Sequence, residues 1–232
     1  QKNNWDQYLG QGQYLREFRR VFFEALEQQE TRMVVNQALT KMKNALPMGL
    51  FHPLIRLSFA NSHGNKGQIA DALAYMAIRY QDLYLKNSLD DKENEESISV
   101  QEIWQHISDK LNHSDLKLPV HRGSLNICED LCAHPEIHQL AFNTGFGLSI
   151  HNLNQQIQEI CLLALRLYLY HPALTTLHAV TAAQALAEIK QGQDLKNPQP
   201  QEAEVNVQLW RRYWVWLTAL YIEKGSPDSL PE

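Results

Sequence analysis

Cysteine is scarce in this sequence, and the three cysteines, Cys128, Cys132 and Cys161, do not make an even-numbered disulfide framework. A chain of 232 residues can bury enough core to fold without disulfides. We therefore expect reduced thiols and a cytoplasmic protein. Cys128 and Cys132 are four residues apart on a predicted helix, but no second ligand pair follows at a zinc-site spacing. Two small core residues are the preferred interpretation.

Long apolar runs are absent too. The longest, residues 160–170, is shorter than the roughly 20 residues that cross a bilayer and contains Arg166, so no membrane association is expected. The net charge is −5, and basic residues adjoin only in isolated pairs, which argues against nucleic acid as a partner. Residues 1–5 show neither a signal-peptide pattern nor an initiator methionine, so we expect the chain to begin inside a longer product.

Strand signals and phosphate-binding loops are missing as well. No alternating run of β-branched residues is bounded by turn pairs. Gly145-Phe146-Gly147 lacks the third glycine and the strand-to-helix context of a dinucleotide-binding loop, so no nicotinamide-binding motif is recognised.

The apolar residues of the sequence repeat with a helical period. Tyr14, Phe18, Val21 and Phe22 recur at three- and four-residue steps, with charged residues on the other faces. The same reasoning predicts helices at residues 31–46, 53–60, 69–85, 100–111, 124–132, 134–142, 153–170, from 172 onward, and 205–220. The polar segment 87–99 has no apolar period and is predicted to be an exposed loop or linker that could divide two lobes. We predict an all-α chain that folds as a globular multi-helix array.

Two histidines stand out because each interrupts an apolar helical run. His52 lies in Phe51-His52-Pro53-Leu54, just before a proline that suits the first turn of a helix. His178 lies in Leu177-His178-Ala179-Val180. A buried imidazole needs a hydrogen-bond partner, a metal or a substrate to offset its desolvation. These two positions are therefore where chemistry is expected.

Four blocks of sequence are distinctive along the chain, and two of them contain these histidines. They are Trp5-Asp6-Gln7-Tyr8-Leu9-Gly10 with Tyr14 and Phe22-Phe23; Phe51-His52-Pro53-Leu54-Ile55-Arg56-Leu57 with Ala72-Leu73-Ala74-Tyr75; Leu177-His178-Ala179-Val180-Thr181 with Ala185-Leu186; and Leu217-Thr218-Ala219-Leu220-Tyr221-Ile222 with Gly225 and Pro227. In content and order they resemble the questin oxidase-like family, across nearly the whole chain. The resemblance implies one helical domain over residues 1–232 that lacks an N-terminal segment of the family.

The resemblance also implies a function. It indicates an oxidoreductase that uses molecular oxygen on a polycyclic aromatic or quinone-like substrate, with Baeyer–Villiger-type opening of an anthraquinone ring as the named activity. A histidine-rich non-haem iron centre occurs in some members, and NADPH is the electron donor that the resemblance suggests. On this basis His52 and His178 are the expected catalytic and metal-binding residues, and Arg56, Gln184 and Trp214 are expected to bind substrate.

Two departures from the family concern histidines. The family's N-terminal Asn-His phrase is not present in this chain, and Gln184 stands where a second histidine is frequent. Glutamine accepts hydrogen bonds but is a poor iron ligand. An iron centre would therefore need further ligands, for which His121, His151 and Glu159 are the candidates.

Each of these residues also has a structural interpretation. His52 could serve the N-terminus of the helix that Pro53 opens, and His178 could be a core imidazole bonded to a backbone carbonyl. Arg56 could steer a quinone oxygen or form an ion pair with Asp71.

Two further clusters favour structural roles. Trp214 shares a helix face with other aromatic residues, which helix packing explains better than substrate contact. His134 and His138 have a metal-chelating spacing, but Pro135 places His134 at a helix end, so we expect exposed surface imidazoles.

The preferred hypothesis is therefore an oxygen-using oxidoreductase with a small hydrophobic or aromatic molecule as its partner. One alternative is a degenerate family member that binds a hydrophobic small molecule without redox chemistry. The other is a helical interaction protein whose histidines are structural, which predicts a large exposed apolar surface. The sequence leaves the oligomeric state open.

Overall fold

The computed structural model describes residues 4–83, 100–112, 127–143, 153–194, 200–227 and 229–231. Within these ranges it contains ten α-helices, three short 3-10 helices and no strand, which confirms the predicted all-α class. The predicted polar loop 87–99 lies outside the described residues. No helix in the described part of the chain is both long enough and apolar enough to cross a bilayer.

The chain divides into two compact units. One contains Gln1–Asp82 and Gln184–Leu209, and the other contains Leu83–Ala183 and Trp210–Glu232. The two longest helices, α9 (Leu174–Asp194) and α10 (Pro200–Glu223), contribute residues to both units. The single domain expected over residues 1–232 stays a prediction.

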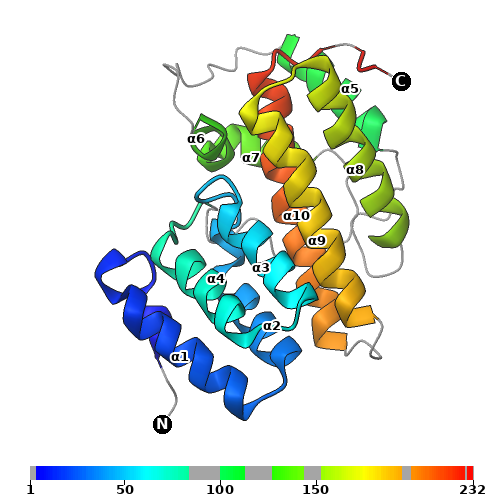
Figure 1. Ribbon diagram of the computed structural model, residues 1–232. Coiled ribbons are helices and arrows are strands. Elements are labelled where there is room, and N and C mark those ends of the chain that lie inside the picture. Colours follow the sequence, from blue (N-terminus) through cyan, green and yellow to red (C-terminus); the bar gives the residue numbers. More distant parts are fainter. Residues whose placement is uncertain are drawn as a thin grey trace. The chain divides into compact units, whose positions relative to one another are not determined.

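The N-terminal part of the first unit contains three 3-10 helices and four α-helices. These are η1 (Trp5–Tyr8), η2 (Gly12–Tyr14), α1 (Leu15–Gln28), α2 (Thr31–Met42), η3 (Lys43–Ala45), α3 (His52–Ser62) and α4 (Lys66–Ile78). Helix α4 packs against both α1 and α3 (Figure 1). Its buried alanines, Ala70, Ala72, Ala74 and Ala77, let both neighbours approach closely.

Helix α1 shows why the apolar period predicted the fold well. Phe18, Phe22 and Leu26 are buried at four-residue steps, as the sequence indicated. On its polar side Arg19 forms an ion pair with Asp71 of α4, and Lys66 Nζ lies 3.1 Å from Glu27 Oε1. These exposed pairs add little stability but fix how the two helices face each other.

Helix α3 begins immediately after a strained turn. Leu50 and Phe51 both have positive φ, 53° and 61°, a conformation that L-residues rarely adopt. The Phe51 side chain is fully buried, and this burial offsets the backbone strain. Pro53 then occupies the first turn of the helix, as predicted, and places His52 at its first residue.

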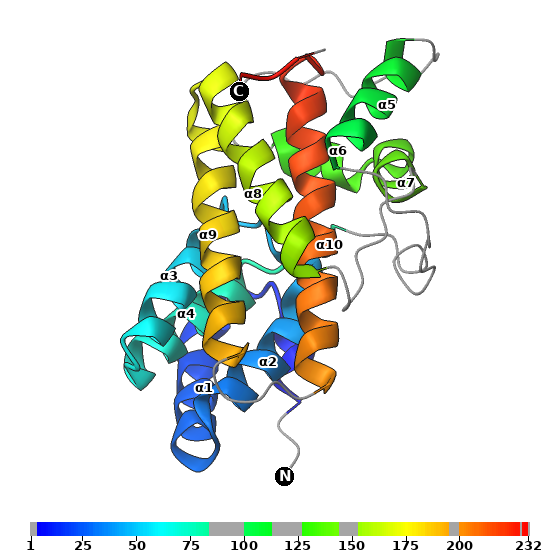
Figure 2. The same cartoon turned by 90° about the vertical axis from the view of Figure 1, so that its right-hand side faces the viewer.

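The second unit is built around the C-terminal half of α10. Its other elements are α5 (Val100–Asn112), α6 (Ile127–Ala133), α7 (Pro135–Asn143), α8 (Leu153–Tyr170) and the first part of α9. In the views of Figures 1 and 2, this part of α10 runs between α8 and α7. Trp104 of α5 stacks on Tyr221 and Trp214 of α10, with ring centroids 4.3 and 5.7 Å apart, and its indole N–H donates to Thr218.

Candidate functional site

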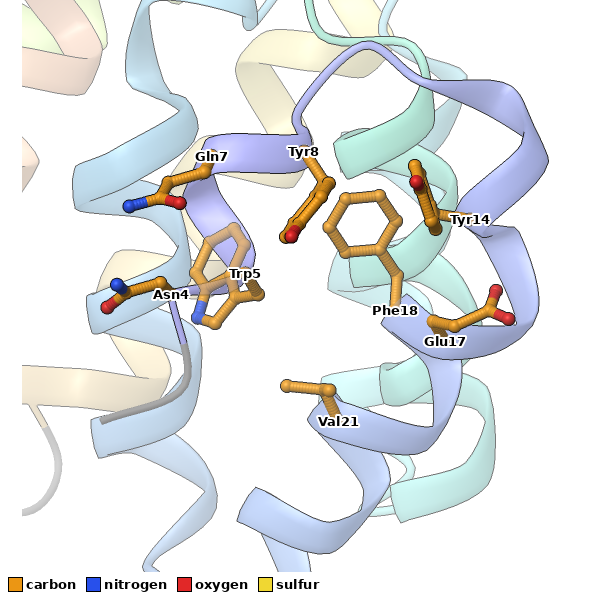
Figure 3. A pocket seen from close by; sticks show the side chains of 8 residues that line it. All are labelled: Asn4, Trp5, Gln7, Tyr8, Tyr14, Glu17, Phe18 and Val21. Carbon is orange, nitrogen blue, oxygen red and sulfur yellow. The ribbon is translucent and has the colours of Figure 1, made fainter. Parts of the chain in front are cut away.

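A hollow in the first unit lies between η1 and α1. It is a pocket of about 410 Å³ (Figure 3), a size that suits a small molecule. Four aromatic residues, two amides, one carboxylate and one valine line it: Trp5, Tyr8, Tyr14, Phe18, Asn4, Gln7, Glu17 and Val21. Among the described residues that line it, Glu17 is the one with a formally charged side chain.

Ring contacts shape the pocket. The Trp5 ring packs edge-on against Phe22, with centroids 4.9 Å apart, and also contacts Phe18 at 6.3 Å. Tyr8 and Tyr14 lie 4.9 Å apart with tilted rings. Phe18 and Phe22 are buried, whereas Tyr8 is 45% exposed. The inner rings are therefore core residues, and the tyrosines form an accessible rim.

Two tethers hold η1 against the rest of the unit. Lys41 Nζ lies 2.8 Å from Asp6 Oδ2, and its hydrogen bond lowers the pKa of that carboxyl, which keeps Asp6 ionised. The Gly10 N–H donates to the Ala77 carbonyl at 2.9 Å. Gly10 has φ +80°, and a Cβ at this position would lie 2.7 Å from the Tyr80 carbonyl oxygen. Only glycine fits there without displacing backbone.

His52 and Arg56 lie on α3 of the same unit. His52 is exposed, and its backbone N–H donates to the Gly49 carbonyl at 3.2 Å. Arg56 is exposed, and its guanidinium lies 5.1 Å from the Tyr75 ring centroid, a cation–π contact. Asp71, the partner expected for Arg56, instead pairs with Arg19, so the proposed ion pair is wrong.

His178 belongs to the second unit and is 9% exposed. Its Nδ1 lies 2.7 Å from the carbonyl oxygen of Leu174, one turn earlier. A carbonyl only accepts, so Nδ1 carries the proton, and in the neutral ring Nε2 holds the lone pair. Metal-binding and proton-accepting histidines are commonly oriented in this way. Exposed His63 makes the same bond to Phe59 at 2.8 Å, so burial, not this bond, distinguishes His178.

Gln184 and Trp214 lie in contrasting surroundings. Gln184 is exposed and its amide donates to Glu188 Oε1 at 2.9 Å. Trp214 is fully buried, and its indole N–H donates to the Ala141 carbonyl at 3.3 Å. Substrate contact by either residue stays a prediction.

Comparison with known proteins identifies the family of this chain. The questin oxidase-like family model matches residues 1–232, the whole chain. The chain belongs to the questin oxidase-like family. No curated protein and no solved structure matches it.

Two glycines of the first unit lie against the C-terminal end of α4. Gly10, which belongs to the first block of the family resemblance, contacts Ala77 of α4 and Tyr80 just beyond it. Gly49, just before the second block, faces the same end, because a Cβ there would lie 3.7 Å from Arg79 Nε and 3.4 Å from Pro53 Cδ. The fold thus brings residues about 40 positions apart to one end of α4.

The donor set for an iron centre is not assembled among the described residues. No group of three or more His, Cys, Asp or Glu side chains within the described ranges is arranged to hold a metal. His52 and His178 belong to different units. Of the suggested helpers, His121 and His151 lie outside the described residues, and Glu159 accepts a hydrogen bond from Gln155 at 3.2 Å. The described residues alone therefore do not fit an iron site.

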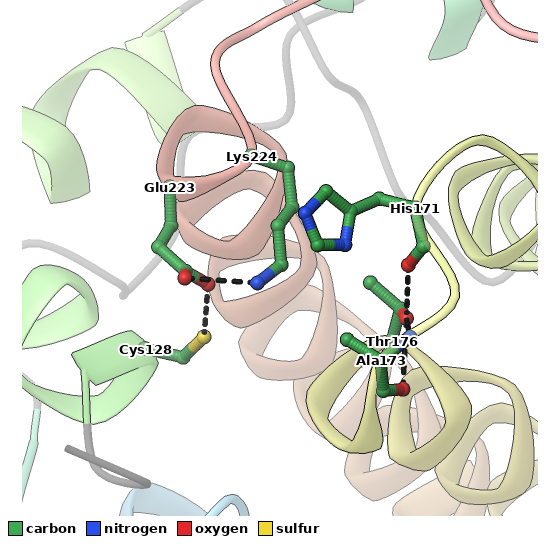
Figure 4. Close-up of polar contacts among 6 residues, drawn as sticks. All are labelled: Cys128, His171, Ala173, Thr176, Glu223 and Lys224. Atoms are coloured by element: carbon green, nitrogen blue, oxygen red, sulfur yellow. Dashed lines mark hydrogen bonds and ion pairs between the residues drawn. The ribbon is translucent and has the colours of Figure 1, made fainter. Parts of the chain in front are cut away.

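The cysteine interpretation is confirmed for α6. Cys128 and Cys132 are fully buried free thiols. Cys128 Sγ donates to Glu223 Oε2 at 3.4 Å, and Glu223 Oε1 lies 2.9 Å from Lys224 Nζ (Figure 4). Burial raises the pKa of the Cys128 thiol, so it stays protonated.

The expectation of two surface imidazoles was wrong for His138 of α7, whereas His134, which precedes α7, is partly exposed. His138 is 2% exposed. Burial, with the nearby charge of Arg212, lowers its pKa from 6.5 to about 4. The partner helix α10 lies about 70 residues further along the chain, so the local sequence carried no sign of it.

Sequence reasoning also missed the pocket. The Trp5–Gly10 block supported the family resemblance, but none of its residues was assigned to a site. The signal that could have found it is local: Trp5, Tyr8 and Tyr14 are concentrated around Gly10 and Gly12. Aromatic residues at a double turn cannot all enter a core, so some must form a surface hollow.

Proposed function

We propose that the chain is an oxidoreductase that uses molecular oxygen on a polycyclic aromatic or quinone-like substrate. The observation that carries the proposal is the match of the questin oxidase-like family model to the whole chain. His52 and His178 are its proposed catalytic residues. Oxygen chemistry needs a group that can pass single electrons to dioxygen, such as a redox metal, and a reduced nicotinamide would supply the electron pair as a hydride; we assign no step to either.

The aromatic pocket supports the substrate class. Its rings offer stacking and edge contacts to a flat ligand, and the amides of Asn4 and Gln7 can donate to quinone oxygens. Among the described residues that line the pocket, only Glu17 carries a formal charge, and its carboxylate favours a neutral ligand over a carboxylate or phosphate. We assign the substrate's ring system to this pocket.

The pocket assignment is tested by binding alone. Isothermal titration of a neutral dihydroxyanthraquinone into the purified chain is compared with the Tyr8→Ala and Phe23→Ala variants. Tyr8 lines the pocket at 45% exposure, and Phe23 is 44% exposed and is not among the lining residues, so the pair is matched in exposure. Loss of one ring contact of about 0.5–1.5 kcal/mol weakens binding roughly 2- to 10-fold for Tyr8→Ala only. Equal affinity in both variants would exclude the pocket.

The redox assignment is tested by oxygen consumption. The chain is supplied with NADPH and a panel of hydroxyanthraquinones, with metal content measured by mass spectrometry on the same samples. His178→Ala should lower the rate by about 100-fold or more if the imidazole acts in the reaction. His63→Ala, which removes the same type of bond from an exposed helix end, should keep the full rate. A wild-type rate in His178→Ala would remove that residue from the mechanism.

One alternative function has specific support. Gln184 occupies the position of a frequent family histidine and is bonded to Glu188 on the surface. A degenerate member that binds a hydrophobic molecule without oxidising it fits that substitution. Tight binding of the anthraquinone in the titration, with no oxygen consumption by any sample in which metal is detected, would favour this alternative over the oxidoreductase.

A further inference from the structure

The carboxylates of α1 differ in whether they have a partner. Glu24 Oε1 lies 3.2 Å from Arg20 Nη1, and Glu27 Oε1 lies 3.1 Å from Lys66 Nζ. Glu17 also has Arg20 three residues further on, a helical spacing at which ion pairs form. Glu17 nevertheless makes no side-chain hydrogen bond or ion pair within the described part of the chain. It is the exposed carboxylate of α1 that lines the pocket.

Helix geometry explains part of this position. Glu17 lies in the first turn of α1, where the helix dipole stabilises a negative charge. The dipole gives no reason for a pocket beside the carboxylate, and the two amides of that pocket are in the same condition. The side chains of Asn4 and Gln7 make no hydrogen bond to any residue that the structure describes. The amides and the carboxylate are therefore all available to a ligand.

These polar groups lie at two separate places. In the view of Figure 3, Asn4 and Gln7 lie beside η1 on one side of the aromatic rings, and Glu17 lies at the start of α1 on the other side. A flat ligand that packs against the rings therefore meets amides at one end and a carboxylate at the other.

The two ends differ in their hydrogen-bonding chemistry. An amide both donates and accepts, so Asn4 and Gln7 can bind a quinone oxygen or a hydroxyl. An ionised carboxylate only accepts, so Glu17 requires a donor from the ligand. A carbonyl or methyl-ether oxygen at that end has only lone pairs to face the carboxylate, whereas a phenolic hydroxyl donates a charge-assisted hydrogen bond. Among the oxygen groups of a neutral quinone ring system, the hydroxyl is the one that Glu17 can bind.

We infer that Glu17 is a specificity-determining residue, which accepts a hydrogen bond from a free phenolic hydroxyl of the substrate and so selects hydroxyquinones over their methyl ethers. The inference rests on the proposed function, because it takes the substrate's ring system to lie in this pocket. It adds an orientation, in which the hydroxyl lies toward α1 and a quinone oxygen lies toward Asn4 and Gln7. The selection concerns binding and does not depend on how the substrate is oxidised.

The test measures the binding of two ligands that differ by one methyl group. Isothermal titration compares a hydroxyanthraquinone, whose hydroxyl lies on an outer ring away from the quinone oxygens, with its methyl ether, at a mildly acidic pH that keeps the phenol neutral. The wild-type chain should prefer the hydroxy compound by roughly 10-fold or more, as expected for a hydrogen bond to a charged group. In Glu17→Leu the preference should fall to about 2-fold or less, because leucine has no acceptor.

Glu24→Leu is the matched control. Glu24 is an exposed carboxylate of the same helix and is not among the residues that line the pocket, so this variant should keep the wild-type preference. Because both glutamates are exposed, both variants should melt within a few degrees of the wild type by circular dichroism.

The outcomes separate the inference from the proposed function. Equal affinity of the wild type for the two ligands, or a preference in Glu17→Leu that matches the wild type, would overturn the inference and leave the pocket assignment intact. Binding of neither ligand would overturn both. Tetramethylammonium that competes for the pocket better than the methyl ether does would show that Glu17 and the rings bind a cation instead. A preference that is lost in Glu17→Leu, in a chain that consumes no oxygen, would support the inference and contradict only the proposed oxidation.

Discussion

Glu129 of α6 carries the sharpest stability prediction. The residue is 3% exposed, and neither carboxyl oxygen has a hydrogen-bond partner within the described part of the chain. Burial raises its pKa from 4.5 to about 7. The folded chain therefore stabilises the neutral acid and penalises the carboxylate. Replacing Glu129 with glutamine retains the shape and removes the charge.

The magnitude follows from that pKa. At about 1.4 kcal/mol per pKa unit, moving from 4.5 to about 7 penalises the ionised form by roughly 3 kcal/mol, an upper value because the site can relax. Below pH 4.5 the carboxyl is protonated in both the folded and the unfolded state. Between pH 4.5 and 7 the unfolded chain ionises first, so the stability of the wild type falls with rising pH, and above pH 7 the loss is complete.

The assay is thermal unfolding at pH 4.5 and pH 8. Glu129→Gln should match the wild type at pH 4.5 and exceed it at pH 8 by roughly 1–3 kcal/mol, or about 3–10 °C in melting temperature for a chain of this size. Glu136→Gln on α7 is the control, because Glu136 is exposed and should give no pH-dependent difference. A melting-temperature difference between Glu129→Gln and the wild type that is the same at both pH values would refute the reasoning.

Two further substitutions test how close packing at Gly10 and burial of His138 affect the stability of the fold. Gly10→Ala places a Cβ 2.7 Å from the Tyr80 carbonyl oxygen at φ +80°, so the free energy of unfolding measured in urea should fall by roughly 2 kcal/mol or more. Gly12→Ala is the control: its Cβ meets nothing within 4 Å, so its free energy of unfolding should stay within about 0.5 kcal/mol of the wild type. His138, whose pKa is lowered to about 4, contributes stability that is complete above pH 6.5 and is lost as the pH falls toward 4. His138→Gln should therefore flatten the acid side of the pH–stability curve. An unchanged acid limb would show that other groups govern it.

The helices could be predicted from the sequence because burial repeats with the helical period. In α1 the apolar residues Phe18, Phe22 and Leu26 recur at four-residue steps and all of them are buried. The start of α3 was predictable for a different reason, the fixed φ of Pro53. The preceding turn was not predictable, because nothing local marks Leu50 and Phe51 as residues with positive φ; only the burial of the Phe51 ring explains them.

Side-chain partners were predicted poorly because they are set by helix packing. Asp71 was matched with Arg56 of α3 but pairs with Arg19 of α1, since α4 contacts both helices and sequence distance does not choose between them. His138 was expected on the surface because Pro135 places the neighbouring His134 at a helix end, yet His138 is buried, close enough to Arg212 of α10 for the arginine charge to lower its pKa. The roles of His52 and His178 stay predictions.

The Trp5–Gly10 block shows why a family motif is weak evidence for chemistry by itself. In this chain Asp6 and Gly10 have structural roles, a tether to Lys41 and a tight backbone contact. Their presence is therefore expected whether or not the protein oxidises anything. Tyr8 differs, because a ring that is 45% exposed at a pocket rim contributes little to folding. A substitution of Tyr8 that changes ligand affinity and not stability would separate function from fold, which no substitution of Asp6 or Gly10 can do.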